Sequence, residues 1–106
     1  VKYNIYCYLK KKQIALTKNK SLSFLNNFKV PKIQLINAKH IKKSNGWVYL
    51  SSYKNSISNI KMDINLFYKF TTIKPKNFQW YNIEGLSKEF IPSFTKKIIN
   101  KVNKVI

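Results

Sequence analysis

Apolar and polar side chains alternate along residues 1–9, and this period of two predicts a half-buried β-strand. The odd-numbered positions would face the core, and the lysines at 10–12 would end the strand. From residue 13 onward the apolar positions take helical spacing. We therefore expect a helix from about 13 to 27, which Asn26-Asn27 would close.

Residues 29–38 alternate again, although Pro31 confines them to an edge strand or to a strand that starts after the proline. The basic segment 39–46 ends in Asn45-Gly46, a strong β-hairpin signal. We expect 47–53 to return beside 29–38 as the second strand of that hairpin. A polar loop is expected at 54–59, followed by a strand over 60–74.

In the carboxyl third, Pro92 suits the first turn of a helix, and an apolar stripe follows it at Phe94, Ile98, Ile99 and Val102. Residues 78–89 fit either a loop or a short helix, and 102–106 are a candidate last strand. This order predicts an α+β fold, a ferredoxin-like split βαβ sandwich with a long protruding β-hairpin. We expect one domain over 1–106, with 39–61 as the hairpin and loop extension and 77–106 as a divergent carboxyl end.

The large excess of positive over negative residues is the most informative feature of the composition. The chain carries 21 lysines, no arginine and only 3 acidic residues, a formal net charge of +18. A pressure toward AT-rich codons exchanges arginine for lysine, but it does not remove aspartate and glutamate, so we infer selection for a polyanionic partner. The abundance of Lys, Ile, Asn, Tyr and Phe itself indicates an AT-rich genome, such as a mitochondrial or plastid genome or the nuclear genome of an AT-rich parasite.

Catalytic chemistry finds little support in the sequence. The lone histidine, His40, lies in a lysine-rich segment, and Asp63, Glu84 and Glu89 are scattered. No combination of nucleophile, base and orienting group is evident. Cys7 is the only cysteine and is expected to be a small buried side chain. We therefore predict that the chain is not an enzyme and has no catalytic residues, no metal site and no cofactor.

The informative pattern is lysine interleaved with aromatic residues around the predicted hairpin. Lysines neutralise backbone phosphates, and exposed aromatic rings stack on unpaired bases. Trp47 and Tyr49 fit core or interface positions as well as stacking positions, and both interpretations stay open. The predicted RNA-binding residues are Lys10, Lys11, Lys12, Lys39, His40, Lys42, Lys43, Tyr53, Lys54, Lys61, Lys69, Lys74 and Lys76.

Residues 47–73 resemble the central segment of the small-subunit ribosomal protein S-ten family. Val48 and Leu50 take its strand positions, Ser51 its serine, and Asp63-Ile64 its Glu-Ile pair, while Lys69 stands at its second arginine. Upstream, 33–36 resembles its I-P-L-P stretch, and 2–29 fits its first strand and helix without gaps.

This resemblance implies a structural constituent of the head of the small ribosomal subunit. Together with the composition, it leads us to expect a mitochondrial protein, located in the matrix and bound to the ribosome. Its partners would be small-subunit rRNA and neighbouring ribosomal proteins of the S-three and S-fourteen type, with no membrane contact. Such a protein would bind rRNA within a ribonucleoprotein and take part in translation. Two alternatives remain: a lineage-specific organellar ribosomal protein of another fold, and a cationic membrane-surface protein, which would need a basic amphipathic helix.

Overall fold

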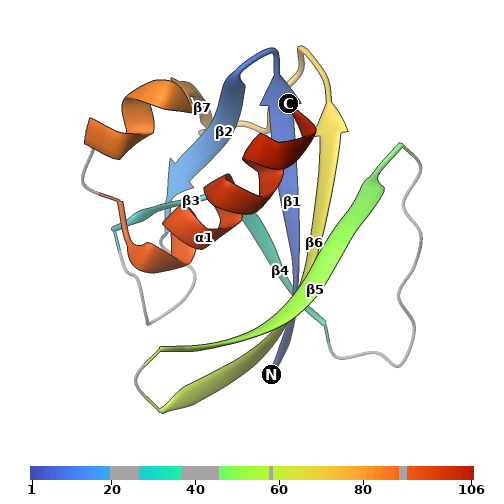
Figure 1. Cartoon of the computed structure of the whole chain (residues 1–106), viewed down its shortest axis with the longest axis vertical. Helices are drawn as coiled ribbons and strands as arrows, with labels where there is room; N and C mark the ends of the chain where they lie inside the picture. The colour runs from blue at the N-terminus through green and yellow to red at the C-terminus, as the bar shows by residue number, and fades with distance from the viewer. Residues whose placement is uncertain (20–26, 37–45, 58, 89–90) are drawn as a thin grey trace.

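The computed structural model describes residues 1–19, 27–36, 46–57, 59–88 and 91–106, and in these ranges seven strands join one mixed sheet with one α-helix against it (Figure 1). In chain order, the elements are β1 (Lys2–Lys10), β2 (Gln13–Lys18), β3 (Lys29–Val30), β4 (Lys32–Ile36), β5 (Val48–Ile57), β6 (Ile60–Phe70), β7 (Gln79–Asn82), the 3-10 helix η1 (Glu84–Lys88), α1 (Ser93–Val102) and the 3-10 helix η2 (Asn103–Val105).

β1 is the central strand. Along one edge it pairs in parallel with β6, from Lys2 opposite Asp63 to Leu9 opposite Phe70. Its other edge is divided, because β4 pairs antiparallel with the first half of β1 and β2 pairs with its last two residues. β2 then leaves β1 and pairs with β7 and β3. The sheet therefore opens where β2 and β4 diverge.

α1 covers one face of the sheet and encloses the main core, as Figure 1 shows. The apolar stripe Phe94, Ile98, Ile99 and Val102 is buried, as the sequence predicted. Thr95 is buried among these residues, and its hydroxyl donates a hydrogen bond to the carbonyl oxygen of Lys29 at 2.7 Å. This bond fixes β3 against the helix.

Aromatic rings form a second cluster across β1, β6 and the start of β5. Tyr6 stacks on Phe67 with 5.4 Å between ring centroids, and its edge meets Trp47 at 5.0 Å. Tyr8 also meets Trp47, at 4.8 Å. Because β1 is buried among these rings as well as in the main core, even Asn4 is only 5% exposed. The prediction of a strand over 1–9 is confirmed, but the prediction that it is half-buried is wrong.

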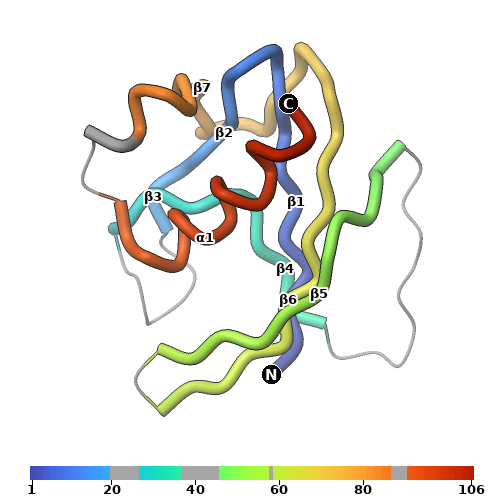
Figure 2. The backbone as a smooth tube through the Cα atoms, in the orientation of Figure 1, coloured from blue at the N-terminus to red at the C-terminus, as the bar shows by residue number. Residues whose placement is uncertain are grey.

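The long hairpin is built differently from the prediction. β5 pairs antiparallel with β6 down to Ile57 opposite Ile60, and the two strands project from the body of the molecule (Figure 2). The expected loop at 54–59 is therefore mostly strand. β4 pairs with β1 and not with β5, so the predicted partner of 47–53 was wrong. The basic turn at 39–45 lies outside the described residues.

The predicted helix over 13–27 is wrong in its first part, because 13–18 form β2; residues 20–26 lie outside the described ranges. Ile14, Ala15 and Leu16 are all buried, so this continuous apolar run is a strand covered on both faces. Two further differences are in the carboxyl third: 79–82 form β7, and the candidate last strand is η2.

The ferredoxin-like prediction is wrong for the same reasons. It requires a helix between the first two strands, whereas β1 turns directly into β2 at Lys11. The described chain is instead mostly sheet, with one short helix near its carboxyl end. The single domain over 1–106 stays a prediction.

Candidate functional site

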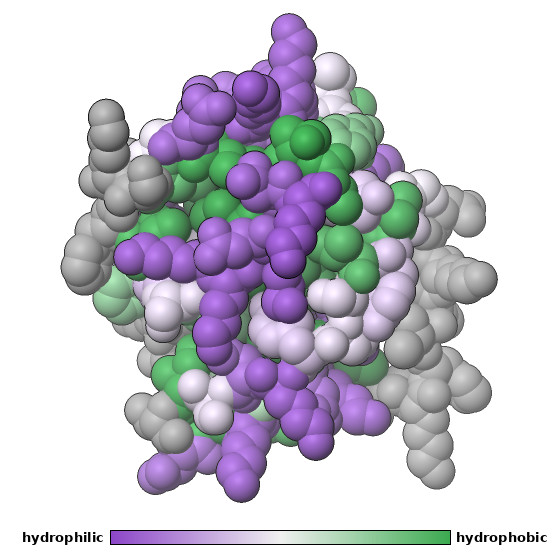
Figure 3. All heavy atoms as spheres, viewed as in Figure 1, coloured by the Kyte–Doolittle hydropathy of each residue, from purple (hydrophilic) through white to green (hydrophobic). Residues whose placement is uncertain are grey.

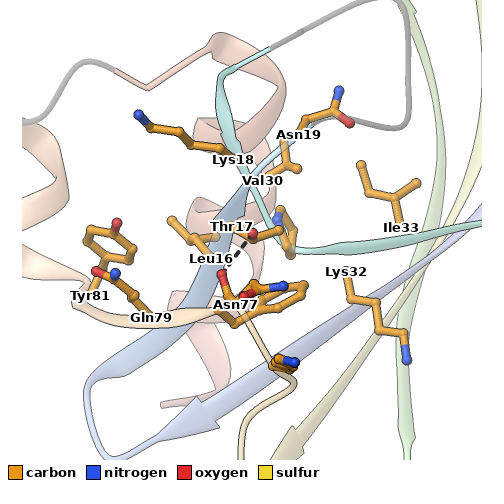
Figure 4. Close-up of a pocket in the computed structure, with 13 residues that line it drawn as sticks. Leu16, Thr17, Lys18, Asn19, Val30, Lys32, Ile33, Asn77, Gln79 and Tyr81 are labelled. Atoms are coloured by element: carbon orange, nitrogen blue, oxygen red, sulfur yellow. Dashed lines mark hydrogen bonds between the residues drawn. The ribbon is translucent and has the colours of Figure 1, made fainter.

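A cavity of about 650 Å³ opens where β2 leaves β1 (Figure 4). Its walls come from β2, from the β3–β4 segment that bends at Pro31, and from the chain entering β7. This volume lies within the range of small-molecule sites. The lining residues are Leu16, Thr17, Lys18, Asn19, Val30, Pro31, Lys32, Ile33, Lys76, Asn77, Phe78, Gln79 and Tyr81.

The floor of the cavity is apolar and fixed. Leu16 and Val30 are 1% and 3% exposed, and Pro31 is fully buried between β3 and β4. Proline has no backbone N–H, so it interrupts strand pairing. The chain can therefore pair with β2 before Pro31 and with β1 after it. This change of partner keeps β2 and β4 apart and leaves the cavity between them.

A tight turn before β7 forms another wall of the cavity. The backbone N–H of Phe78 donates to the carbonyl oxygen of Pro75 at 3.2 Å, and Asn77 adopts a left-handed conformation with φ 71°. Asparagine tolerates this conformation at the third position of a turn. The Thr17 hydroxyl donates to the carbonyl oxygen of Asn77 at 3.0 Å, drawn as the dashed line in Figure 4. The turn is thereby held against β2.

β7 completes this wall through its pairing with β2, in which Leu16 lies opposite Gln79 and Ile14 opposite Tyr81. The ammonium group of Lys29 lies 4.7 Å from the centre of the Tyr81 ring, a cation–π arrangement. Phe78 is half-buried, and the amides of Asn77 and Gln79 are exposed beside it. Aromatic surface and amide groups thus meet on one side of the cavity.

Positive charge surrounds the opening. Lys18, Lys32 and Lys76 line the cavity and are exposed, and Lys18 lies directly opposite Lys29 across the β2–β3 pair. In Figure 4, Lys18 and Tyr81 lie toward one end of the cavity and Lys32 toward the other. None of the described residues that line the cavity is acidic. The arrangement suits an anionic ligand that also has an aromatic or apolar part.

The predicted RNA-binding residues that the structure describes fall at several places: some lie near the paired carboxyl ends of β1 and β6, and others lie on the β5–β6 hairpin. Lys10 lies over Trp80 at 4.8 Å, and Lys12 forms an exposed ion pair with Glu84 at 3.5 Å. Lys69 lies over Trp47, at 5.7 Å. Figure 3 likewise shows hydrophilic side chains spread across the face that α1 covers. The other members are placed as follows: Lys11 is exposed in the β1–β2 turn, Lys74 is exposed in the segment after β6, Lys54 and Lys61 lie on the β5–β6 hairpin, and Lys76 lines the cavity. Lys39, His40, Lys42 and Lys43 lie outside the described residues.

Tyr53 is not a surface stacking residue. It packs against the main core, and the ammonium group of Lys101 lies 4.7 Å from its ring centre. Burial, and to a lesser extent the nearby Cys7, raise the pKa of the Tyr53 hydroxyl above its ordinary value. Burial likewise raises the pKa of the Cys7 thiol, which keeps that group protonated and unreactive. The expectation that Cys7 is a small buried side chain is confirmed.

Sequence reasoning missed most of the cavity. Lys18 fell within the predicted helix and Lys32 within a predicted strand, and neither was singled out. Asn77 and Tyr81 lay in a segment with no assigned function. One signal was present, because Pro75-Lys76-Asn77 has the composition of a turn. Its position beside Thr17 depends on β2, which was not predicted as a strand.

Within the described ranges, no three residues among His, Cys, Asp and Glu lie close enough to hold a metal ion. The described helix is also too short and too polar to cross a membrane.

No protein-family model matches this chain, and no curated protein matches its sequence. Among solved structures, the chain is similar to the NUDIX domain of Shewanella oneidensis NrtR, solved in complex with ADP-ribose. The TM-score is 0.77, the likeness covers 98% of this chain and 86% of that chain, and 6% of the residues are identical. The fold is NUDIX-like. At this identity the likeness establishes the arrangement of strands and helix and nothing further.

This finding corrects the resemblance to ribosomal protein S-ten, together with what that resemblance implied. The assignment to a small ribosomal subunit was wrong. The predictions that rRNA and proteins of the S-three and S-fourteen type are its partners, and that it takes part in translation, were wrong as well. The two alternatives, a ribosomal protein of another fold and a membrane-surface protein, are withdrawn together with this assignment. The expectation that the chain is not an enzyme is withdrawn too, because the fold is similar to that of a NUDIX domain.

Proposed function

We propose that this chain binds a small nucleotide that carries a diphosphate, in the cavity between β2, β3–β4 and β7. The single observation that carries the proposal is the composition of that cavity. Three lysines, two exposed amides and two aromatic rings line a space of about 650 Å³. The NUDIX-like fold supports the proposal, because the similar domain was solved with ADP-ribose.

Each class of lining residue has a role that its chemistry suggests. Lysine ammonium groups meet phosphate as point charges. The rings of Phe78 and Tyr81 offer surface for a base or a ribose. Asn77 and Gln79 carry both hydrogen-bond donors and acceptors, which suits the edge of a base. The buried floor of Leu16 and Val30 excludes water from beneath the ligand.

Hydrolysis of the bound nucleotide is the second candidate, which the NUDIX-like fold suggests. The same samples test it, because chromatography of the ligand after incubation separates a bound nucleotide from its products. Incubation with and without Mg²⁺ covers both a metal-assisted reaction and one that uses protein groups alone.

Mapping the ligand by NMR tests the proposal. A titration of isotope-labelled protein with ADP-ribose should shift backbone amide signals of residues 16–19, 29–30, 32–33 and 76–81 and the side-chain amides of Asn77 and Gln79. Signals of the hairpin tip near Ile57 and Ile60 serve as the internal control, because these residues lie on a different part of the sheet. Shifts confined to the hairpin, or spread evenly over the lysines, would contradict the proposal.

The mitochondrial location stays a proposal that rests on composition alone. Its ribosome-bound part is withdrawn with the ribosomal assignment. Fractionation of the native cells, followed by detection of the protein in the matrix fraction, would test it.

A further inference from the structure

We propose that the outer edge of β5 binds an acidic, extended segment of another protein, which adds a strand to the sheet. β5 ends the strand order β3-β2-β1-β6-β5, and among the described residues it pairs with β6 alone. Figure 1 shows that β5 lies on the other side of β1 from β2. The edge is therefore separate from the proposed nucleotide cavity, and what binds there does not depend on the proposed function.

The edge is regular over residues 51–57. There the pairing with β6 continues without a break to the hairpin tip, whereas the register shifts between Tyr49 and Ser51. Proline, inward-facing charges and bulges are the usual features that keep an edge strand from pairing with another chain. Residues 51–57 contain no proline, and Lys54 is the only charged residue among them. An extended partner of about seven residues therefore fits this segment.

Side-chain hydrogen bonds hold β5 in place on the face opposite the main core. The hydroxyl groups of Tyr49 and Ser52 are 2.6 Å apart, and the Ser52 hydroxyl donates to Oδ1 of Asn65 at 2.7 Å. The Asn65 amide in turn donates to Oδ1 of Asn4 at 3.2 Å. This chain of bonds joins β5 through β6 to the central strand β1. Because the edge is already ordered, binding of a partner strand costs less conformational entropy.

Two lysines of α1 reach β5 on the core face. The Lys97 ammonium group donates to Oδ1 of Asn55 at 2.9 Å, and the Lys101 ammonium group lies 4.7 Å from the centre of the Tyr53 ring. Tyr53 and Asn55 are two positions apart on one strand, so their side chains point to the same face. An added strand would lie about 4.8 Å beyond β5, which brings its side chains opposite these two residues within reach of both ammonium groups. Carboxylates at two alternate positions of the partner therefore complement this edge.

The charge of the chain favours a foreign partner over a second copy. Pairing of two β5 edges would bring together two molecules that each carry a net charge of +18, and these would repel one another. An acidic segment would be attracted instead. The partner is therefore recognised by strand geometry together with acidic residues at alternate positions.

Calorimetric titration with a synthetic peptide tests the strand geometry. The probe is a peptide of about eight residues in which glutamate and valine alternate, to match the length of the edge. Its control has the same sequence with a methyl group on every backbone nitrogen, which removes the hydrogen-bond donors and keeps the charge. We expect the unmodified peptide to bind at least about tenfold more tightly. Equal affinities, or no binding of either peptide, would overturn the inference.

Charge-matched double variants test the contribution of the α1 lysines. Lys97→Gln with Lys101→Gln should weaken peptide binding about three- to tenfold, because two lysine–carboxylate pairs at the surface are lost. Lys18→Gln with Lys76→Gln removes the same charge at the nucleotide cavity and should leave peptide affinity unchanged. Thermal melting of both variants shows whether each is folded. Equal losses of affinity in two folded variants would overturn the inference.

Amide hydrogen exchange, followed by NMR, locates the bound peptide even if a variant fails to fold. In an end strand, the N–H groups of alternate residues point away from the neighbouring strand. The peptide should therefore slow exchange at alternate residues of 51–57 in the wild type. Unchanged exchange over 51–57 would overturn the inference. Sedimentation of the protein without peptide tests the other occupant, and a stable dimer in which 51–57 is already protected would overturn the inference in favour of a second copy.

Discussion

Thr17 and Asn77 are 60 residues apart in sequence, yet the Thr17 hydroxyl donates a hydrogen bond to the backbone oxygen of Asn77 at 3.0 Å. This contact joins β2 to the turn that precedes β7 and so holds that wall of the cavity in place. It also stabilises the left-handed conformation of Asn77. The position of this turn therefore depends on a hydrogen bond between side chain and backbone as well as on the β2–β7 pairing.

Replacing Thr17 with valine should loosen that wall while keeping the side-chain shape. Because the hydrogen bond is exposed, we expect only about 0.5 kcal/mol of lost stability, at the low end for such bonds. Nucleotide affinity should fall more than stability does, since the turn carries Lys76, Asn77 and Phe78. Urea denaturation and calorimetry measure the two effects. Thr72→Val, at an exposed position outside the cavity, is the control, and an equal loss of affinity there would contradict the account.

Phe78 should supply ring surface to the base. Truncation to alanine removes that surface, and base–aromatic stacking amounts to about 1–3 kcal/mol. We therefore expect Phe78→Ala to weaken ADP-ribose binding by about tenfold or more in calorimetric titrations. Phe70→Ala removes an exposed ring outside the cavity and should leave affinity unchanged. Equal affinities of the two variants would show that Phe78 does not contact the ligand.

Because the Cys7 thiol is buried, we expect the stability of the fold to fall at alkaline pH. Burial raises the pKa of this thiol above the ordinary value of about 9. In the unfolded chain the thiol loses its proton near pH 9, whereas in the folded chain it keeps it. The unfolded state then binds fewer protons, so stability is complete below pH 9 and falls as pH rises above it.

Denaturation with urea at pH 7.5, 9.5 and 10.5 measures this effect. The free energy of unfolding of the wild type should fall by up to about 1.4 kcal/mol per pH unit more than that of Cys7→Ala. Lysine deprotonation affects both proteins equally, so the difference between them reports the thiol together with its smaller effect on the pKa of Tyr53. Parallel pH profiles would contradict burial of Cys7.

The sequence predicted those elements whose pattern is local and regular. β1 and β6 alternate with period two, and α1 carries its apolar stripe after Pro92, so each was found near its observed bounds. β2 was missed because its apolar run Ile14-Ala15-Leu16 is buried on both faces, and periodicity alone does not separate such a strand from a helix.

Pairing was harder to predict than the elements themselves. Asn45-Gly46 indicates a turn, but a turn signal does not name the strand that follows as its partner. The parallel pair of β1 and β6 joins segments about 60 residues apart, and no local signal marks it. The cavity depends on this non-local arrangement, because it exists only where β2 and β4 diverge. Of the predicted site residues that the structure describes, only Lys76 lines it.

The central claim is that a nucleotide binds between β2, β3–β4 and β7 through the lysines there. Calorimetric titration with ADP of two charge-matched double variants tests it most directly: Lys18→Gln with Lys76→Gln inside the cavity, and Lys61→Gln with Lys104→Gln outside it. Both lower the net charge of +18 by two. We predict about tenfold or greater loss of ADP affinity in the first variant and little change in the second. Equal losses in both would contradict the claim, because ADP would then be responding to overall charge and not to this cavity.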